Sequence, residues 1–359
     1  MIRKSPRNSI PKKHSMELPR RILIGPGVLR ELAKVLSELG LSGPALLVSG
    51  HHVIDTVRVI VEDSLLAEEF TYDWTTISAP TRKDVRKVLD AARALQAKMI
   101  VGIGGGKSVD VAKLAASTIG VQFVSVPTSA SHDGISSPFV SLKDLKKPYS
   151  VLAQSPMGII ADLDIIGKAP GELLLSGCGD LLAKITAVRD WELSAKKKGE
   201  YYGRYAAELA LLGAEMVMKG AERIGSRSAS GIRDVLEALI SAGVAAGIAG
   251  SSRPCSGSEH LFSHALDIVA PNHGLHGEQC GLGAIMMAKL HGIEWQSIAT
   301  ALERLGGHTQ ASQLGLSEED IVKSLLLART IRPERYTILN MTRLTREKAL
   351  RLATSTGVC

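Results

Sequence analysis

The chain has 359 residues, which is too long for one ordinary core and predicts two domains. Hydrophobic residues make up 45% of the sequence and charged residues 22%, a balance that excludes a largely disordered protein. The formal net charge is +7, and most of the excess lies in residues 1–21. Because no aromatic residues interleave with these charges, we interpret them as a solvated tail and expect no nucleic-acid partner.

The cysteines and the apolar runs indicate the redox compartment of the protein and whether it crosses a membrane. No CxxC or other paired spacing connects the four cysteines, which are Cys178, Cys255, Cys280 and Cys359. Nothing resembling a cleaved signal peptide precedes the first regular pattern, so we expect a reduced, cytoplasmic setting. The longest apolar run, residues 238–249, is shorter than the ~18 residues needed to cross a bilayer, which predicts no transmembrane segment.

The first half of the chain alternates short apolar runs with helical patterns, which is typical of parallel strands joined by crossover helices. Thr81 is the expected cap of the second helix. Residues 142–148 have the composition of a hairpin tip. Strands are predicted at 45–49, 99–103 and 123–126, and helices at 53–68, 81–97 and 108–118.

From about Leu163 the strand patterns nearly disappear and long helical patterns follow. The predicted helices cover residues 171–194, 202–224, 232–249, 258–269 and 278–290. The sequence therefore predicts the α/β fold class: a tail over 1–16, a Rossmann-like parallel-sheet domain over 17–163 and an all-helical domain over 164–359. The active site is expected in the cleft between the two domains.

A glycine-rich loop follows the predicted strand at 99–103 and opens the next helix. Gly104, Gly105 and Gly106 precede Lys107 and Ser108 in this loop. Glycines let backbone amides approach a pyrophosphate, and a helix N-terminus adds partial positive charge. The spacing matches neither the Walker pattern nor GxGxxG, which disfavours a generic ATPase. A tight turn is the alternative interpretation of this loop taken alone.

A second polar loop, from Pro127 to Gly134, follows the next predicted strand. Both loops belong at the carboxyl edge of one parallel sheet, where ligands bind in such folds, and this favours a dinucleotide site. After the strand at 45–49 the chain lacks the acidic residue that would hold a ribose 2'-hydroxyl, since Ser49-Gly50-His51-His52 stands there. We therefore expect that both NADH and NADPH serve as cofactors.

A set of histidines and one aspartate has the spacing of metal ligands. His260 and His264 are four residues apart and share one face of a predicted helix, while His276 follows after a turn. Asp180 heads an apolar helix, where a carboxylate without a cation or donor is costly. Two imidazoles, one carboxylate and an open position form the ligand set of a catalytic zinc site. The alternative for the first two histidines is a hydrogen-bonded pair in the core.

Together these elements resemble the archaeal sn-glycerol-1-phosphate dehydrogenases, within the larger group of glycerol dehydrogenases, iron-dependent alcohol dehydrogenases and dehydroquinate synthases. The similarity lies in Gly104-Gly-Gly-Lys-Ser108, Ser131-His-Asp-Gly134, Gly257-Ser-Glu-His-Leu-Phe-Ser-His264 and His276-Gly-Glu278. The resemblance implies reversible NAD(P)H-dependent reduction of dihydroxyacetone phosphate to sn-glycerol 1-phosphate. That step sets the stereochemistry of archaeal membrane lipids.

The resemblance also implies roles for individual residues. Zinc is expected on Asp180, His260 and His276, and the substrate on Asp133, Asp180 and His264. Asp133 and His264 are the expected catalytic residues. The dinucleotide is expected on residues of the two loops and on one neighbouring serine: Gly106, Lys107, Ser108, Val109, Asp110, Thr128, Ser129, Ala130, Ser131 and Ser137.

The expected mechanism combines a Lewis acid with hydride transfer from the nicotinamide. Zinc, or iron in its place, polarises the substrate carbonyl. His264 is placed to exchange a proton or to hold a substrate hydroxyl, whereas Asp133 is alternatively a loop cap. No spacing rule selects the phosphate pocket among Lys107, Lys184 and Arg253.

Three other functions stay open on the sequence alone. The first is a zinc- or iron-dependent dehydrogenase of an unphosphorylated polyol such as glycerol, and the second is a lyase of the dehydroquinate synthase type. The third is a metal- and nucleotide-binding sensor without catalysis. A two-domain enzyme with aliphatic helices is also expected to form a homo-oligomer.

Overall fold

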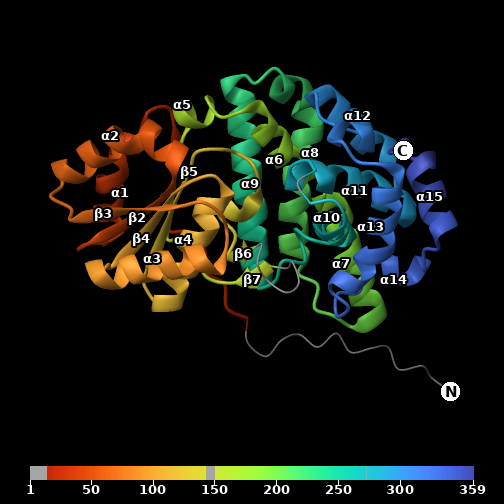
Figure 1. Cartoon of the computed structure of the whole chain (residues 1–359), viewed down its shortest axis with the longest axis horizontal. Coiled ribbons are helices and arrows are strands. Elements are labelled where there is room, and N and C mark those ends of the chain that lie inside the picture. Colours follow the sequence, from red (N-terminus) through yellow and green to blue (C-terminus); the bar gives the residue numbers. More distant parts are fainter. Residues whose placement is uncertain (1–13, 143–149, 272) are drawn as a thin grey trace.

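The computed structural model describes residues 14–142, 150–271 and 273–359. An α/β half and a helical half lie side by side, the first coloured red to yellow and the second green to blue in Figure 1. The predicted fold class, a parallel-sheet α/β part followed by helices, is confirmed. Within the described ranges, no helix is both long enough and apolar enough to span a membrane.

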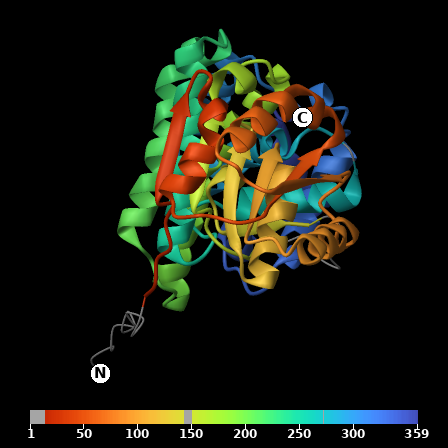
Figure 2. The same cartoon turned by 90° about the vertical axis from the view of Figure 1, so that its left-hand side faces the viewer.

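One parallel sheet forms the centre of the α/β half, with the strand order β1-β8-β5-β4-β2-β3. The central strands are buried because helices cover both faces, as the view in Figure 2 shows. Successive residues point to opposite faces, so Leu47 and Val101 pack in one core layer while Val48 and Ile100 pack in the other. The strands are β1 (Arg21–Gly25), β2 (Ala45–Gly50), β3 (Tyr72–Ile77), β4 (Met99–Gly104), β5 (Gln122–Pro127) and β8 (Gly158–Asp162).

The helices of this half divide between the two core layers. The short 3-10 helix η1 (Val28–Glu31), α1 (Leu32–Glu38) and α2 (His51–Ala67) belong to one layer. The other layer contains α3 (Arg82–Leu95) and α4 (Gly106–Ile119). Thr81 caps α3 as predicted, because its hydroxyl accepts a hydrogen bond of 3.2 Å from the Asp84 N–H.

The elements that were not predicted from the sequence include strands β3 and β8 and one helix break. β3 is an edge strand that carries Asp73 and is only partly buried, so its apolar pattern is weak. β8 is short and begins with a glycine. The single helix predicted over 171–194 is wrong, because the chain forms α6 (Gly171–Leu182) and α7 (Lys184–Lys198), which meet at Ala183.

Two predicted segments fall largely outside the described residues. The hairpin tip predicted at 142–148 has only Leu142 among them, and β6 (Phe139–Ser141) pairs antiparallel with β7 (Ser150–Leu152) on either side of it. Of the predicted tail, residues 1–13 are not described. His14 is described, and its Nε2 lies 2.5 Å from the Ile248 carbonyl oxygen.

After Asp162 the described chain is helical. The helix predicted at 258–269 has those bounds, and the helices predicted at 202–224, 232–249 and 278–290 shift by at most three residues at either end. Besides α6 and α7, the helices are α5 (Leu163–Ile166), α8 (Arg204–Gly225), α9 (Ala229–Ala249), α10 (Ser258–Val269), α11 (His276–His291), α12 (Trp295–Leu305), η3 (Ala311–Leu314), α13 (Glu318–Ile331), α14 (Ile338–Thr342) and α15 (Arg346–Ser355).

Glycines allow α6 and α11 to cross at very short distance. A Cβ atom on Gly277 would lie 1.7 Å from the Ser176 carbonyl oxygen, and one on Gly179 would lie 2.1 Å from the Gly277 carbonyl oxygen. No side chain fits in either place. The crossing brings Asp180, on α6, towards His276, the first residue of α11.

We predict that Gly277→Ala lowers the free energy of unfolding by ~1–3 kcal/mol, because the added methyl forces the two backbones apart. Gly281→Ala in the same helix is the matched control. Its Cβ would lie 3.3 Å from the Leu302 side chain and 3.7 Å from the Gly179 Cα, so it meets no backbone atom at short distance. Urea unfolding of both variants tests the difference. If the two variants had equal stability, the crossing would not depend on Gly277.

Candidate metal centre and active site

Three helices bring the predicted metal ligands together. Asp180 comes from α6, His260 and His264 from α10, and His276 from the start of α11. The rings of His260 and His276 are 5.0 Å apart edge to face, and those of His264 and His276 are 5.8 Å apart and stacked. Asp180, His260 and His264 are buried. Residues 80 to 96 positions apart in the sequence therefore meet at one site.

Hydrogen bonds fix the proton of His276 on Nδ1. The Ser263 hydroxyl donates to Gln279 Oε1 at 2.7 Å, so it accepts from His276 Nδ1 at 3.0 Å. The Gln279 amide is oriented by its own bond to the His273 carbonyl oxygen at 2.8 Å. Burial, followed by the neighbouring His260 and His264, lowers the pKa of His276 to about 3. His276 is thus neutral, with a free lone pair on Nε2.

His260 is oriented in the same manner. Its Nδ1 lies 2.9 Å from Oε1 of Glu259, a fully buried carboxylate that also accepts from the Thr186 hydroxyl at 2.7 Å. Its Nε2 lies 3.3 Å from Asp180 Oδ1. In metal sites, ligating histidines donate Nδ1–H to a carboxylate or another acceptor and bind the metal through the other nitrogen. In both histidines Nδ1 is hydrogen-bonded and Nε2 is the remaining ring nitrogen, and this arrangement fits a metal centre.

A cysteine that the sequence analysis did not select belongs to the same site. Ligand atoms of His260, His276 and Cys280 all lie within 4.8 Å of one another, and we call these three residues the His–Cys cluster. The Cys280 Sγ lies 3.6 Å from His276 Nε2. Asp180 does not belong to this compact set. The spacing of four residues between His276 and Cys280 was the available sequence signal.

His264 has a polar atom without a partner. Its Nδ1 is buried, and among the described residues no group hydrogen-bonds to it. The Asp267 carboxylate is 4.0 Å away, which is too far for a hydrogen bond. Burial lowers the pKa of His264, so the ring is neutral at neutral pH. A buried ring nitrogen of this kind is suited to a ligand hydroxyl or a transferred proton.

Lys184 joins the two predicted substrate carboxylates. Its side chain is fully buried, and its Nζ lies 2.7 Å from Asp133 Oδ2 and 2.7 Å from Asp180 Oδ1. The third donor of the ammonium points to the Cys255 carbonyl oxygen at 3.3 Å. Burial alone would lower the pKa of Lys184, but the carboxylates outweigh burial and raise it, so the amine is charged. All three donors are in use, which leaves none for a substrate phosphate.

The other two phosphate candidates differ in exposure. Arg253 is buried, and its guanidinium donates to Glu200, Ser194 and the Tyr336 carbonyl oxygen. Lys107 is exposed at the start of α4. Of the three basic residues considered, Lys107 is the one whose side chain is open to solvent.

The second loop leaves the sheet at β5 and docks on the helical half. Asp133 begins the short 3-10 helix η2 (Asp133–Ile135), and its N–H donates to Asp180 Oδ2 at 3.1 Å. The Ser136 hydroxyl donates to the Ile240 carbonyl oxygen of α9 at 2.8 Å. These two bonds hold the loop between the sheet and the helices α6 and α9.

The glycine loop has the predicted context, between β4 and α4. Gly104 has a φ of 146°, and the N-cap residue Gly105 has no side-chain cap. A Cβ on Gly106 would lie 1.7 Å from His132 Nε2, so the His132 ring rests directly on this glycine. The two predicted loops therefore lie next to each other at the carboxyl edge of the sheet.

Several side chains of the predicted dinucleotide site already have structural partners. The Asp110 carboxylate accepts from the Ser141 N–H at 2.9 Å and lies 3.5 Å from the amine of the fully buried Lys113. Val109 is buried in the core, and the Ser137 hydroxyl accepts from the Phe139 N–H at 3.2 Å. At these positions only the backbone is readily available to a cofactor.

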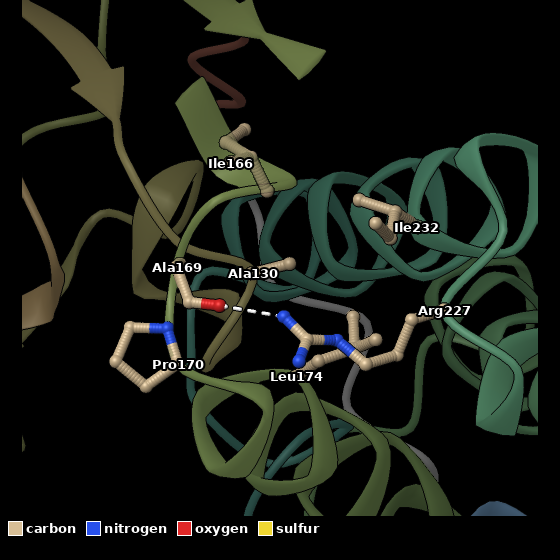
Figure 3. A pocket seen from close by; sticks show the side chains of 7 residues that line it. All are labelled: Ala130, Ile166, Ala169, Pro170, Leu174, Arg227 and Ile232. Atoms are coloured by element: carbon tan, nitrogen blue, oxygen red, sulfur yellow. Dashed lines mark hydrogen bonds between the residues drawn. The ribbon is translucent and has the colours of Figure 1, made fainter. Parts of the chain in front are cut away.

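Figure 3 shows a concavity where the second loop meets the helices. Arg227 reaches across it and donates to the Ala169 carbonyl oxygen at 2.8 Å. The volume of the concavity is about 10 Å³, which holds one water molecule at most, so the concavity is a packing gap and not a substrate site. The lining residues are Ala130, Ile166, Ala169, Pro170, Leu174, Arg227 and Ile232.

The chain is similar in fold to solved dehydrogenase structures. A probable glycerol dehydrogenase from Sinorhizobium meliloti aligns with a TM-score of 0.78 at 17% identity, covering 96% of this chain and 98% of that one. Sulfoacetaldehyde reductase from Bifidobacterium kashiwanohense, solved with NAD+, aligns with a TM-score of 0.74 at 18% identity, covering 96% and 98%. At these identities the similarity shows the fold alone.

Sequence relatives are much nearer. A family model described as iron-containing alcohol dehydrogenase matches residues 23–170. Glycerol-1-phosphate dehydrogenase (NAD(P)+) of Cenarchaeum symbiosum is 52% identical over 345 residues, covering 96% of this chain and 97% of that protein. The protein of the same name from Nitrosopumilus maritimus is 49% identical over 347 residues, covering 97% and 98%. The chain therefore belongs to the glycerol-1-phosphate dehydrogenase family.

Proposed function

We propose that the protein catalyses the reversible NAD(P)H-dependent reduction of dihydroxyacetone phosphate to sn-glycerol 1-phosphate, in archaeal-type membrane glycerophospholipid biosynthesis. The observation that carries this proposal is the identity of 49% and 52%, over nearly the whole chain, to two relatives with that enzyme name. The clustered histidines of α10 and α11, together with the glycine loop after β4, give the same chemistry a physical basis. An oxidoreductase of an unphosphorylated polyol is the alternative that the same fold permits.

Asp180, His260 and His276 are the residues we propose to hold the metal, with zinc as the ion and iron as the alternative. Support comes from the two imidazoles: the Nδ1 of each is held by an acceptor, and the Nε2 of His260 lies 3.3 Å from Oδ1 of Asp180, the third proposed ligand. When bound, the ion supplies Lewis-acid polarisation of the substrate carbonyl. The protein contributes position and charge around that carbonyl.

Asp133, Asp180 and His264 are proposed to bind the substrate, with Asp133 and His264 as catalytic residues. The free Nδ1 of His264 supports a role in holding a hydroxyl or moving a proton. The Asp133 side chain is 18% exposed beside the buried Lys184, so part of this side chain is accessible to a ligand. Lys107 is our candidate for an electrostatic contact with the phosphate.

The dinucleotide is proposed to bind residues Gly106 to Asp110, Thr128 to Ser131 and Ser137. In this division, residues 17–163 form the dinucleotide-binding part and residues 164–359 the part for metal and substrate. Backbone amides at the start of α4 suit a pyrophosphate. We also propose that the enzyme is a cytoplasmic homo-oligomer without a nucleic-acid partner.

The first prediction concerns the substrate and the cofactor. We expect oxidation of both NADH and NADPH with dihydroxyacetone phosphate, because no acidic side chain follows β2 to exclude a 2'-phosphate. Dihydroxyacetone should react far more slowly. Steady-state kinetics with the four combinations, followed by determination of the product's handedness, provides the measurement. Preference for dihydroxyacetone would favour the polyol alternative, and lack of any turnover would favour a sensor.

The second prediction separates metal binding from proton transfer. His276→Ala should lose both zinc and activity, because it removes an oriented Nε2 donor. His264→Ala should keep zinc and lose roughly 10²–10⁴-fold in kcat, the usual contribution of a general acid or base. Metal analysis of the purified variants and kinetics give both readouts. Loss of zinc from His264→Ala would make it a ligand, and normal activity of zinc-free His276→Ala would refute the metal mechanism.

Charge compensation at Lys184 leads to a third prediction. Lys184→Met leaves Asp133 and Asp180 without their cation, which should lower the free energy of unfolding by ~3–5 kcal/mol. A bound dication beside Asp180 would offset part of this loss, so added zinc should stabilise this variant more than the wild type.

Lys113→Met is the matched control, because Lys113 is also fully buried but lies against the Gly134 and Phe139 carbonyl oxygens and Asp110. Its destabilisation should not depend on zinc. Denaturant unfolding with zinc and with a chelator measures both variants. Equal zinc dependence of the two would contradict the proposed position of the metal.

A further inference from the structure

The described N-terminal segment lies against the turn between α7 and α8. The His14 ring is 5.5 Å from the Tyr201 ring. The Trp191 indole of α7 donates to the Tyr201 carbonyl oxygen at 2.5 Å, which fixes this turn. Figure 2 shows the red N-terminal trace running beside the green helices. Two stretches far apart in the sequence therefore form one surface, and we call residues 14–20 and 196–205 the basic corner.

Positive charge gathers at the basic corner. Its exposed basic residues are Arg20, Lys196, Lys197, Lys198 and Arg204. Carboxylates offset this charge only in part. Glu192 pairs with Lys196 at 2.6 Å, Glu200 is already paired with the buried Arg253, and Glu17 is exposed. In sequence, the residues before His14 add Arg3, Lys4, Arg7, Lys12 and Lys13 and no acidic residue. An anionic partner therefore fits this corner.

Large apolar side chains are exposed among these charges. The exposed fraction is 51% for Met16, 47% for Leu18 and 68% for Tyr205. Leu212 follows Tyr205 by seven residues, so it lies on the same face of α8, and it is also exposed. Basic residues beside exposed aliphatic and aromatic side chains are typical of protein surfaces that lie in the interfacial region of a membrane.

We propose that the basic corner docks the protein reversibly on an anionic lipid surface. The inference goes beyond the proposed function and does not depend on it. The lysine and arginine side chains contact the phosphate head groups, and each contributes roughly fivefold in affinity near the surface. Met16, Leu18 and Tyr205 enter the boundary between head groups and acyl chains.

Nucleic acid fits this corner less well than lipid. Proteins that bind single strands stack the bases on aromatic rings. The rings of Tyr201 and Tyr202 already pack against Trp191, with centroids 6.2 Å and 4.9 Å away. Met16 and Leu18 offer a base neither a stacking surface nor a hydrogen bond. Their exposure is explained by lipid and not by a nucleic acid.

A second copy of this chain is also a poor partner for the basic corner. In a two-fold contact the same surface of both copies is buried, so basic residues of one copy would face those of the other. Juxtaposed like charges oppose association. A lipid surface of negative charge has no such conflict.

Sedimentation of the full chain with lipid vesicles tests the proposal. We expect binding to vesicles that contain phosphatidylglycerol, weak binding to phosphatidylcholine alone, and release by added salt. Lys197→Gln combined with Arg204→Gln removes two positive charges, so binding should weaken roughly 25-fold. Met16→Ser combined with Leu18→Ser withdraws apolar groups from the lipid and should weaken binding at least about tenfold.

Lys348→Gln combined with Arg351→Gln is the matched control. Both residues are exposed on α15, away from the basic corner in Figure 1, and the variant loses the same charge. It should bind like the wild type. Equal thermal midpoints of all variants show that each is folded.

Three outcomes would overturn the inference. The first is no binding to the anionic vesicles, or equal weakening by the control, which would leave the charges as a solvated surface. The second is tighter binding of a single-stranded RNA oligonucleotide that depends on Lys197 and Arg204. The third is a change of sedimentation coefficient in the Met16→Ser, Leu18→Ser variant without lipid, which would make this surface an interface between copies.

Discussion

The buried ammonium of Lys184 is the interaction on which the arrangement of the site depends. It links Asp133, on the loop after β5, to Asp180 on α6, and so ties the sheet half of the molecule to the helical half. Two carboxylates this close, Asp180 buried and Asp133 partly buried, would repel each other without a cation between them. Because both are paired, the loop that follows the glycine site is held against the helices that carry the histidines.

The orientation of the histidine rings depends in turn on a surrounding set of hydrogen bonds. Glu259 and Ser263 hold the Nδ1 atoms of His260 and His276, so both Nε2 atoms are directed without a metal having to organise them. The glycine-lined crossing of α6 and α11 brings Asp180 near these rings. Preorganisation of this kind means that little reorganisation is needed when a carbonyl is polarised.

Sequence patterns predicted most of the fold and part of the site, for physical reasons. The helix at 258–269 has a strong apolar period and clear ends, whereas β3 carries Asp73 at an exposed edge and gave no such signal. Histidine spacing indicated the proposed metal centre. The contacts of Cys280 and Lys184 depend on how distant helices cross, and the structural role of Asp110 depends on a bond to Ser141, so no local pattern could predict them.

Anomalous X-ray diffraction at the zinc edge, on crystals grown with zinc and NAD(P)H, tests the central claim most directly. The account predicts one anomalous peak at about 2.0–2.1 Å from the Nε2 atoms of His260 and His276, with the nicotinamide ring next to that peak. A zinc peak elsewhere in the molecule, or a nicotinamide bound away from these two histidines, would contradict it.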